Sequence, residues 1–456
     1  MSTLWTSGEA EGATLGRASQ PFAVTGLSLN SRTLKPGDLY VAIKGETRDG
    51  HDFVRAAFEA KAGAALVARR PDGVAEDAPL LTVANTQRAL EDLARAARVR
   101  SDAKIVAVTG SAGKTTTKEM LKLAFAALGP THVSGASFNN HWGVPLSMAS
   151  LPRETAYGVF EIGMNHFGEI RSLVSLVRPH VALITTVAPA HLEFFGNTES
   201  IADAKSEIFE SIVPGGAALI PSDSPYAERL FARARQFHVA RVLTFGAKPG
   251  SDARLLSYEE SAEGARVKAE VLGRPVDFRL AAVGRHIAAN ALGGLLSVAA
   301  ADGDVLNAAA ALKTFAALKG RGARFSAGGV RVIDESYNAN PASMAAALAL
   351  LGQAKSRRIA VLGDMLEMGP GAGAHHAGLV APIDGAQVDL VFLCGPLMKS
   401  LWDALPAQRR AVYAPSSAEL AAGLMSALRE GDTVLVKGSN GIRMSVIIDA
   451  LKARAG

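Results

Sequence analysis

The sequence predicts an α/β protein built from three domains, each of which combines strands with helices. The chain has 456 residues, which is too long for one ordinary hydrophobic core. Apolar runs of three to five residues recur along it, and helical stretches separate most of them. This alternation is typical of parallel sheets and falls into three regions, for which we predict the boundaries 1–98, 99–317 and 318–456.

The first region, residues 1–98, is predicted to be a small α/β domain. Residues 39–43 and 64–68 are apolar runs of strand length, and residues 53–62 between them predict a helix. Residues 1–5 contain no basic segment followed by an apolar run, so a secretory signal is not predicted.

The second region, residues 99–317, is predicted to contain a parallel, doubly wound sheet. Its strand candidates are continuous apolar runs, as expected for strands buried on both faces: 105–108, 158–160, 181–184, 217–220 and 242–245. Residues 251–280 predict shorter antiparallel strands at the edge of this sheet. The apolar stretch 287–301 is short for a bilayer span and contains Asn290, so it predicts a buried core helix and no membrane span.

The third region, residues 318–456, is predicted to be a second, Rossmann-like unit. It begins near the run Lys-Gly-Arg-Gly at 319–322. Strand candidates alternate with helix candidates, the strands at 330–333, 359–362, 390–393 and 434–436 and the helices at 341–351 and 418–428. Ligands of such units bind at the carboxyl ends of the strands, so we expect the functional site between domains.

Charge and cysteine content restrict the function classes. The net charge is +5 and the pI is about 9.2, a mild bias that fits a polyanionic substrate such as a nucleotide. It is weak support for nucleic acid, which we do not expect as a partner. The single cysteine, Cys394, cannot form an internal disulfide, which indicates a reducing, cytoplasmic compartment. Its apolar neighbours at 391–393 predict a buried, inert thiol.

A glycine-rich turn at Gly110, Ser111, Ala112, Gly113, Lys114, Thr115 and Thr116 follows the strand at 105 and precedes a predicted helix at 118–128. Such a turn directs backbone N–H groups and the helix N-terminus at phosphate oxygens. Lys114 would hold the outer phosphates of ATP, and a following threonine would complete a Mg²⁺ shell. The full P-loop pattern places its first glycine where this chain has Val108, so the loop is a shortened form. The alternative is a plain glycine turn with a surface lysine.

Two further residues stand directly after predicted strands of the same sheet. Glu161 ends the strand at 158–160, and His191 follows the strand at 181–184. Because a doubly wound sheet carries its chemistry at these carboxyl ends, both are candidates for catalysis and for binding Mg²⁺. Lys205 lies on an amphipathic helix, where its spacing alone predicts a surface lysine.

Four segments carry a resemblance that covers nearly the whole chain: Ser-Phe-Asn-Asn at 137–140, Glu-Ile-Gly-Met-Asn-His at 161–166, Asp-Glu-Ser-Tyr-Asn-Ala-Asn-Pro at 334–341 and Gly-Asp-Met-Leu-Glu-Met-Gly at 363–369. Together they resemble the Mur ligases of bacterial peptidoglycan synthesis. The run at 336–341 followed by Gly-Asp-Met resembles the member that joins D-Ala-D-Ala to UDP-MurNAc-tripeptide. The resemblance implies a UDP-binding N-terminal domain, a central ATPase and a C-terminal Rossmann-like domain.

The implied reaction makes an amide at the expense of ATP. ATP phosphorylates the terminal carboxylate of UDP-MurNAc-tripeptide, and the amine of D-Ala-D-Ala attacks the acyl phosphate. A tetrahedral intermediate then expels phosphate. Phosphorylation is needed because a free carboxylate has no good leaving group, and catalysis then depends on positioning and on neutralising phosphate charge.

The resemblance implies roles for individual residues. The implied catalytic residues are Lys114, Glu161, His191 and Lys205. Two Mg²⁺ ions are implied, with Thr115, Glu161, His191 and a carbamylated Lys205 as their ligands. The implied nucleotide contacts are Asn290 on adenine, Asp334 or Glu335 on ribose, and Arg324 on the γ-phosphate. The implied substrate contacts are Ser31, Arg32, Glu46 and Thr47 for uridine, Asn140, Asn165 and His166 along the sugar phosphates or peptide, and Asn338, Asn340 and Asp364 in the nucleotide and dipeptide clefts. Many relatives carry Asn where this chain has Ile287.

Several alternatives stay open. Another amide ligase of the same superfamily is possible, either the Mur ligase that adds the third residue or a folylpolyglutamate synthetase. A P-loop ATPase that ligates nothing and a nucleotide-binding module are alternatives of other classes. The sequence leaves open whether the tripeptide ends in lysine or diaminopimelate, and we expect a monomer.

Overall fold

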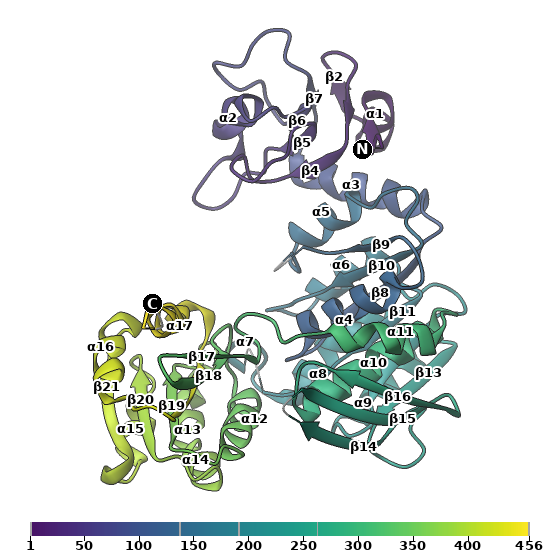
Figure 1. Ribbon diagram of the computed structural model, residues 1–456. Helices are drawn as coiled ribbons and strands as arrows, with labels where there is room; N and C mark the ends of the chain where they lie inside the picture. The colour runs from purple at the N-terminus through teal and green to yellow at the C-terminus, as the bar shows by residue number, and fades with distance from the viewer. Residues whose placement is uncertain (1, 136–137, 190–191, 262, 455–456) are drawn as a thin grey trace.

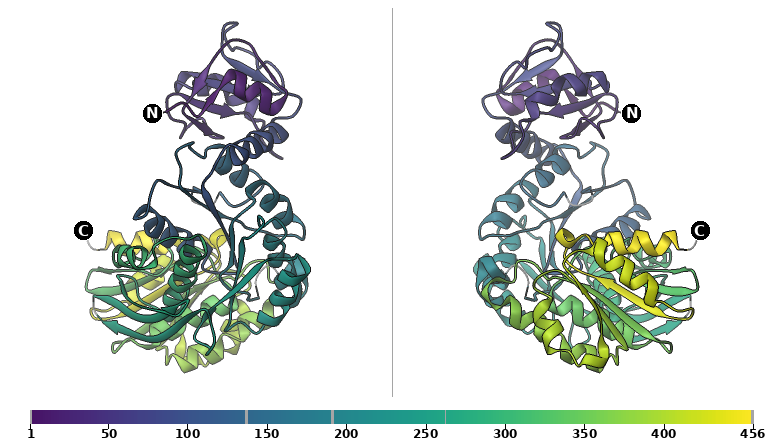
Figure 2. Two further views of the ribbon diagram at one scale, coloured as in Figure 1. Left: turned by 90° about the vertical axis from the view of Figure 1, so that its right-hand side faces the viewer. Right: turned by 90° about the vertical axis from the view of Figure 1, so that its left-hand side faces the viewer.

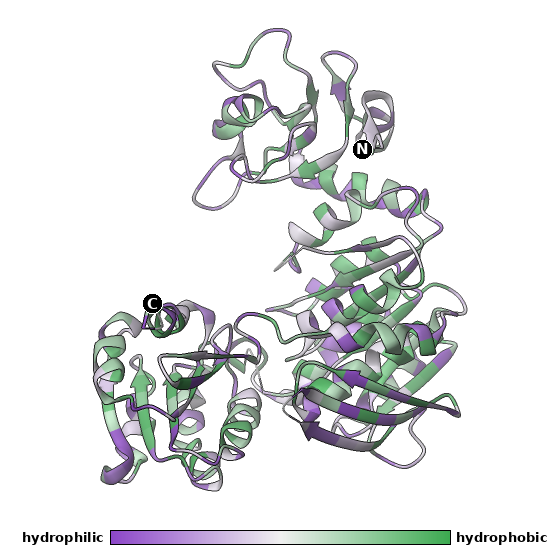
Figure 3. Ribbon diagram, viewed as in Figure 1, coloured by the Kyte–Doolittle hydropathy of each residue, from purple (hydrophilic) through white to green (hydrophobic). Residues whose placement is uncertain are grey.

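The computed structural model describes residues 2–135, 138–189, 192–261 and 263–454. These residues form three sheet-containing bodies that follow one another along the chain (Figure 1). The N-terminal body lies at one end of the molecule, and the C-terminal body lies beside the central one (Figures 1 and 2). In Figure 3, hydrophobic residues are concentrated on strands such as β19 (Arg358–Gly363) and β20 (Leu390–Cys394). The predicted three-domain α/β fold is confirmed.

The N-terminal body contains a five-stranded sheet of order β2-β7-β6-β5-β4 and a two-stranded sheet of β1 and β3. The strands are β1 (Trp5–Thr6), β2 (Arg17–Ala18), β3 (Ala23–Val24), β4 (Gly26–Ser28), β5 (Asp38–Val41), β6 (Ala64–Val67) and β7 (Leu80–Thr82). The helices are α1 (Ser7–Thr14), α2 (Val54–Glu59) and α3 (Thr86–Val99). The predicted strands at 39–43 and 64–68 are confirmed, and the predicted helix is the shorter α2.

Helix α3 links the first body to the second. It packs against α5 (Gly143–Ala149), so that Leu90 and Leu93 share a core with Val144 and Met148. The indole of Trp5 also donates to the Ala149 carbonyl, at 2.9 Å. The boundaries at residues 98 and 317 stay predictions, because this packing continues across the first of them.

The central body is a nine-stranded sheet of order β16-β15-β14-β13-β12-β11-β8-β10-β9. Its parallel strands are β8 (Lys104–Thr109), β9 (Thr131–Val133), β10 (Tyr157–Glu161), β11 (Val181–Ile184), β12 (Ala217–Pro221) and β13 (Arg241–Gly246). Its edge hairpins are β14 (Ala253–Ser261), β15 (Gly264–Val271) and β16 (Arg274–Leu280), which pair antiparallel as predicted for 251–280. Strand β8 lies between β10 and β11, so the chain crosses from one side of β8 to the other when it passes from β10 to β11. Ligands of doubly wound sheets bind at such a switch point.

Helices cover both faces of the central sheet. They are α4 (Lys114–Ala126), α5, α6 (Glu169–Val177), α7 (Leu192–Phe195), α8 (Thr198–Ser206), α9 (Ala227–Gln236), α10 (Arg285–Ala300) and α11 (Val305–Ala311). Strand β8 shows why both faces need cover, because Ile105 and Ala107 belong to one hydrophobic core and Val106 and Val108 to another. Helix α10 packs against α4 on the second face, which confirms the predicted buried helix. In the described residues, no helix is both long and apolar enough to cross a membrane.

The C-terminal body is a six-stranded sheet of order β17-β18-β22-β19-β20-β21. The strands are β17 (Ala323–Ala327), β18 (Val330–Glu335), β19, β20, β21 (Arg410–Ala414) and β22 (Thr433–Lys437). The helices are α12 (Pro341–Gly352), α13 (Ala372–Ala377), α14 (Val380–Gly385), α15 (Lys399–Ala404), α16 (Ser417–Ala427) and α17 (Ser445–Ala453). Among the described strands of this sheet, only β17 pairs antiparallel, with β18 at the edge. Cys394 ends β20 fully buried, and burial raises the pKa of its thiol to about 11.

Candidate active site

A cavity of about 620 Å³ lies between the central and C-terminal bodies. The central body contributes the loops at the carboxyl ends of β8, β10 and β11, together with the start of α10. The C-terminal body contributes the ends of β18 and β22 and the first turns of α12. The cavity is therefore at the switch point of the central sheet, as the sequence predicts for a ligand site.

The glycine-rich turn has the backbone that phosphate binding requires. Gly113 is the N-cap of α4 and has a φ of +83°, a conformation that side chains rarely adopt. A Cβ at this position would also lie 2.8 Å from the Asn290 amide, so any other residue would be strained and would have to displace that amide. The turn and the N-terminus of α4 line the cavity, where an anion would be stabilised.

The segment after β11 holds this turn in place. The Ser111 amide donates to the Thr186 carbonyl at 2.9 Å, and its hydroxyl donates to the Ala188 carbonyl at 2.8 Å. The Thr185 hydroxyl donates to the Ala112 carbonyl at 2.5 Å. The turn is thus fixed at three points before any ligand binds, which reduces the entropy lost when phosphate is ordered on it.

Lys114 lines the cavity from the first residue of α4. Its ammonium donates to the Gly110 carbonyl at 2.8 Å. Desolvation lowers the pKa of Lys114, the charge of Glu161 raises it, and the charge of Arg321 lowers it. An anionic phosphate in the cavity would favour the charged amine, as a phosphate-binding lysine requires.

Glu161 and Thr115 come together as the sequence predicts. The carboxylate of Glu161 is 3% exposed and accepts the Thr115 hydroxyl at 2.8 Å through one oxygen. Its other oxygen accepts the Asn139 amide, also at 2.8 Å. A carboxylate and a hydroxyl beside a phosphate loop are the oxygen donors that Mg²⁺ takes. Among the described residues, no three His, Cys, Asp or Glu side chains converge on a metal site. The donors present therefore fit a Mg²⁺ that obtains its other ligands from phosphates and water.

Lys205 is not the surface lysine that its spacing predicts. It lies on α8 and is 2% exposed. Burial lowers the pKa of its amine well below the usual value, and the charge of Lys114 lowers it further. In the part of the chain that the structure describes, no carboxylate lies within ion-pair distance of this amine. His191, the other predicted residue of this cluster, lies outside the described residues.

The two acidic residues at the end of β18 have different surroundings. The Asp334 carboxylate is 1% exposed and accepts the Gly320 amide at 2.9 Å and the Ser336 hydroxyl at 2.6 Å. It therefore holds two loop segments together. Glu335 lines the cavity instead, 3.5 Å from the buried ammonium of Lys437, which also donates to the Asn338 carbonyl at 2.9 Å. Of the two residues, Glu335 is the one available to a ligand.

Arg321, which sequence reasoning missed, lines the cavity where Arg324 was predicted to act. Its guanidinium stacks on the Tyr337 ring, 3.9 Å from the ring centroid. Arg324 is not among the cavity-lining residues, and its pKa is lowered by burial and raised by the charges of Glu260 and Tyr258. The available signal was the position of Arg321 in the 319–322 run, directly at the start of the third region.

The remaining predicted nucleotide and dipeptide contacts divide into two groups. Asn290, Asn338 and Asn340 line the cavity, as does Ile287, where many relatives carry Asn. The Asn340 side chain also caps α12 by accepting the Ser343 amide at 2.9 Å. Asp364 does not line it. Its carboxylate is 1% exposed beneath the loop after β20, where it accepts the Leu397 amide at 3.2 Å and the Met398 amide at 2.8 Å. Burial raises the pKa of Asp364, and the structure brings it to no ligand surface.

The predicted contacts of the UDP-linked substrate are only partly brought to this cavity. Asn165 lines it. The Asn140 side chain instead accepts the Gly143 amide at 2.9 Å at the start of α5, and His166 is exposed beside Glu169, at 3.2 Å. The predicted uridine contacts do not line the cavity but lie on loops of the N-terminal body, partly or fully exposed: Ser31, Arg32, Glu46 and Thr47.

Comparisons with known proteins cover nearly the whole chain. The family described as "Mur ligase middle domain" matches residues 108–298, "Mur ligase, glutamate ligase domain" matches 320–440, and "Mur ligase family, catalytic domain" matches 23–98. The UDP-N-acetylmuramoyl-tripeptide–D-alanyl-D-alanine ligase of Rickettsia prowazekii is 33% identical over 424 residues, covering 93% of this chain and 94% of the relative. The enzyme of that name from Escherichia coli is 34% identical over 449 residues, covering 98% and 96%.

Solved structures agree with these relatives. A crystal structure of MurF from Acinetobacter baumannii superposes with a TM-score of 0.87 at 30% identity, covering 98% of this chain and 99% of that chain. The MurF ligase from Thermotoga maritima in complex with ADP superposes with a TM-score of 0.80 at 24% identity, covering 95% and 98%. The likeness to the second structure is one of fold.

Proposed function

The chain belongs to the Mur ligase family, and from this premise we propose that it is the ATP-dependent ligase that joins D-Ala-D-Ala to UDP-MurNAc-tripeptide. The observation that carries the proposal is the composition of the cavity. The phosphate loop and Glu161 form one wall, and residues of the 334–341 run form the other. This run distinguishes the family member that adds the dipeptide. The phosphate loop and the distinguishing residues therefore line the same cavity.

The first step transfers the γ-phosphoryl group of ATP to the terminal carboxylate of the tripeptide. A carboxylate oxygen bonds to phosphorus, the bond from phosphorus to the β,γ-bridging oxygen breaks, and ADP leaves. The phosphate loop and the Lys114 ammonium hold the charged oxygens in position. Arg321 contributes a second positive charge from the opposite body, and Glu335 is placed for the ribose hydroxyls. Thr115 and Glu161 would hold Mg²⁺, which would supply neutralisation of the phosphate charge.

The second step forms the amide. The amine of D-Ala-D-Ala attacks the acyl carbon to give a tetrahedral intermediate, the bond from that carbon to the phosphate oxygen breaks, inorganic phosphate leaves, and the nitrogen loses a proton. Asn165, Asn338 and Asn340 line the cavity and offer amide groups that can bind carboxylate or peptide oxygens. Because this step needs an acceptor amine at the acyl phosphate, binding the correct dipeptide is part of catalysis.

We also propose that Lys205 is carbamylated and helps to bind a second Mg²⁺ together with His191. The buried amine and its lowered pKa support this, since the uncharged amine is the form that adds CO₂. The carbamate would place an anion beside the Lys114 ammonium. A monomeric state and a cytoplasmic location remain expectations from the sequence.

Mass spectrometry of the product tests the proposed function. Purified protein is incubated with ATP, Mg²⁺ and UDP-MurNAc-tripeptide. Parallel reactions contain D-Ala-D-Ala or a single amino acid such as glutamate as the acceptor. The expected product is UDP-MurNAc-pentapeptide, formed only with the dipeptide. Ligation of a single amino acid instead would indicate another amide ligase of the superfamily, and ATP hydrolysis without any ligated product would contradict a ligase.

A further inference from the structure

We propose that Glu207 is a positioning residue of the ligase. Its carboxylate fixes the loop before α6, which carries Asn165 and His166, against the segment that carries Lys205. This inference rests on the proposed function, because it assigns Glu207 to the geometry of that reaction. Glu207 stands two residues after Lys205, at the start of the 3₁₀ turn Glu207–Phe209.

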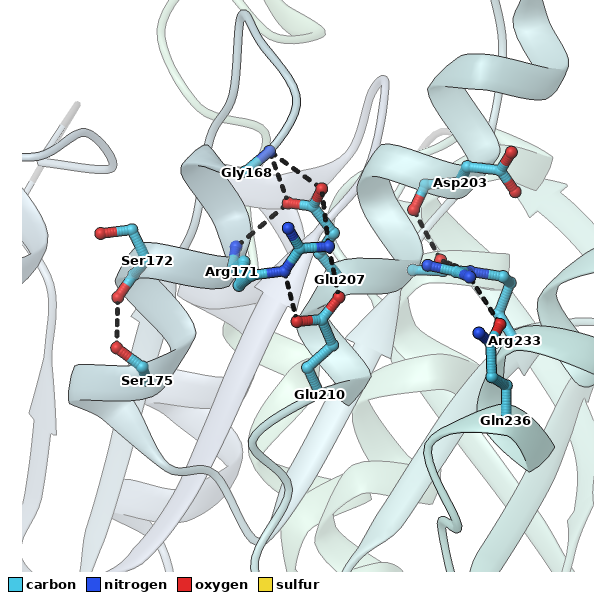
Figure 4. A network of polar contacts seen from close by, with 10 residues as sticks. Gly168, Arg171, Ser172, Ser175, Asp203, Glu207, Glu210, Arg233 and Gln236 are labelled. Atoms are coloured by element: carbon cyan, nitrogen blue, oxygen red, sulfur yellow. Dashed lines mark hydrogen bonds and ion pairs between the residues drawn. The ribbon is translucent and has the colours of Figure 1, made fainter.

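Glu207 is a buried carboxylate whose main partners are backbone N–H groups. It is 2% exposed. The Gly168 amide donates to its two oxygens, at 2.9 and 3.1 Å, and the Arg171 amide donates to one of them at 3.1 Å (Figure 4). Gly168 is the N-cap of α6 and has no side chain with which to cap the helix. Glu207 therefore supplies from another segment the capping group and the negative charge that a helix N-terminus requires.

The charge of Glu207 is not required to hold the Arg171 side chain. That guanidinium lies on the surface and makes two hydrogen bonds to Glu210, at 2.6 and 2.9 Å, but approaches Glu207 only to 3.7 Å. Glu210 can therefore satisfy Arg171 alone. The two carboxylates lie side by side in Figure 4, yet only Glu207 is hydrogen bonded to the backbone of the loop.

The loop that Glu207 caps also packs on the segment that follows His191. The Phe167 ring contacts Phe195 edge-on, with centroids 5.0 Å apart, and the His166 ring lies 4.7 Å from Phe194. Phe194 and Phe195 belong to α7, which begins at Leu192. Displacing the loop before α6 would therefore disturb Asn165 in the cavity and the packing of α7 together.

The other side of the Lys205 helix is held independently. The Asp203 carboxylate accepts the Arg229 guanidinium at 2.6 and 2.8 Å, and Arg233 donates to the Ser206 hydroxyl at 3.0 Å. These contacts join α8 to α9, whereas Glu207 joins the end of α8 to α6. Loss of Glu207 would thus free the Gly168 and Arg171 amides at the start of α6 while α8 stays anchored on α9. Asn165 would shift with that helix start, because its amide donates to Glu169 of α6 at 2.6 Å.

The test compares Glu207→Gln with Glu210→Gln in the full-length protein. Glutamine keeps the size of Glu207 but presents an NH₂ group to one of the backbone N–H donors. We expect kcat for pentapeptide formation to fall about tenfold to 100-fold in Glu207→Gln, the usual cost of losing a supporting partner of a catalytic site. The KM for ATP should stay within about twofold, because the phosphate loop keeps its own tethers. Glu210→Gln should keep kcat within about twofold, since it loses only a surface ion pair.

A structural measurement separates positioning from loss of folding. Hydrogen exchange at the amides of Gly168 and Arg171 should quicken in Glu207→Gln and not in Glu210→Gln, at a temperature well below unfolding. If Glu207→Gln folds poorly, Glu207→Asp is measured as well. Because aspartate keeps the charge, its kcat per folded molecule should exceed that of Glu207→Gln. Wild-type kcat in a folded Glu207→Gln would overturn the inference. Absence of pentapeptide with the wild-type protein would instead overturn the proposed function.

Discussion

Replacing Arg321 with methionine separates the two arginines that could reach the phosphates. Arg321 lines the cavity, and Arg324, three residues later, does not. A hydrogen bond to a charged group contributes roughly 1.5–3 kcal/mol. At 1.36 kcal/mol for each factor of ten, loss of one such bond in the transition state lowers kcat/KM roughly tenfold to 150-fold. The substitution also removes the stacking of Arg321 on Tyr337, at 3.9 Å from the ring centroid. Loss of this contact destabilises the loop that carries Asn338 by about 0.5–1 kcal/mol.

A secondary effect on Lys114 has a known sign. The charge of Arg321 lowers the pKa of Lys114, so Arg321→Met raises that pKa and leaves the lysine more fully protonated. Reduced activity could therefore not be explained by a neutral Lys114. The assay is steady-state phosphate release at saturating UDP-MurNAc-tripeptide and D-Ala-D-Ala with varied ATP. Activity within about twofold of wild type in Arg321→Met, with a large loss in Arg324→Met, would refute this reasoning and restore Arg324 to the γ-phosphate.

Three further predictions concern single positions. Gly113→Ala forces a side chain into a φ of +83° and brings it within 2.8 Å of Asn290. We therefore expect the affinity for ADP, measured by calorimetry, to fall at least about tenfold. Unchanged affinity would show that the turn rearranges freely. Lys205→Ala should be inactive and partly rescued by an added short-chain carboxylate, and full activity without rescue would exclude a carbamate. Cys394, with a pKa raised to about 11, should not react with a thiol reagent at pH 8 until the protein unfolds, whereas rapid labelling of the native chain would contradict its burial.

The strands of the central sheet could be predicted because they are continuous apolar runs. Strands β8 and β11 match the runs at 105–108 and 181–184, where every residue is buried. The edge strand β9 was missed, since its residues Thr131–Val133 are only partly buried and carry no apolar run. Edge strands bury little surface, so hydrophobic pattern alone detects them poorly.

The candidate site was predictable where function leaves a local pattern. The turn at 110–116 and Glu161 follow strands directly, and the sheet topology brings them together. Lys205 gave no local signal, because its burial depends on the packing of α8 in the folded chain. Asp364 was predicted in a ligand cleft, yet its neighbours Leu397 and Met398, distant in sequence, enclose it. Such long-range contacts cannot be read from periodicity.

The most direct test of the central claim is phosphate release from ATP with UDP-MurNAc-tripeptide, measured with and without D-Ala-D-Ala. We predict sustained release only when both are present. The acyl phosphate formed in the first step releases its phosphate only when the dipeptide amine attacks the acyl carbon. Release that proceeds equally without the dipeptide, or without either substrate, would contradict the ligase and leave only a nucleotide-binding loop with ATPase activity.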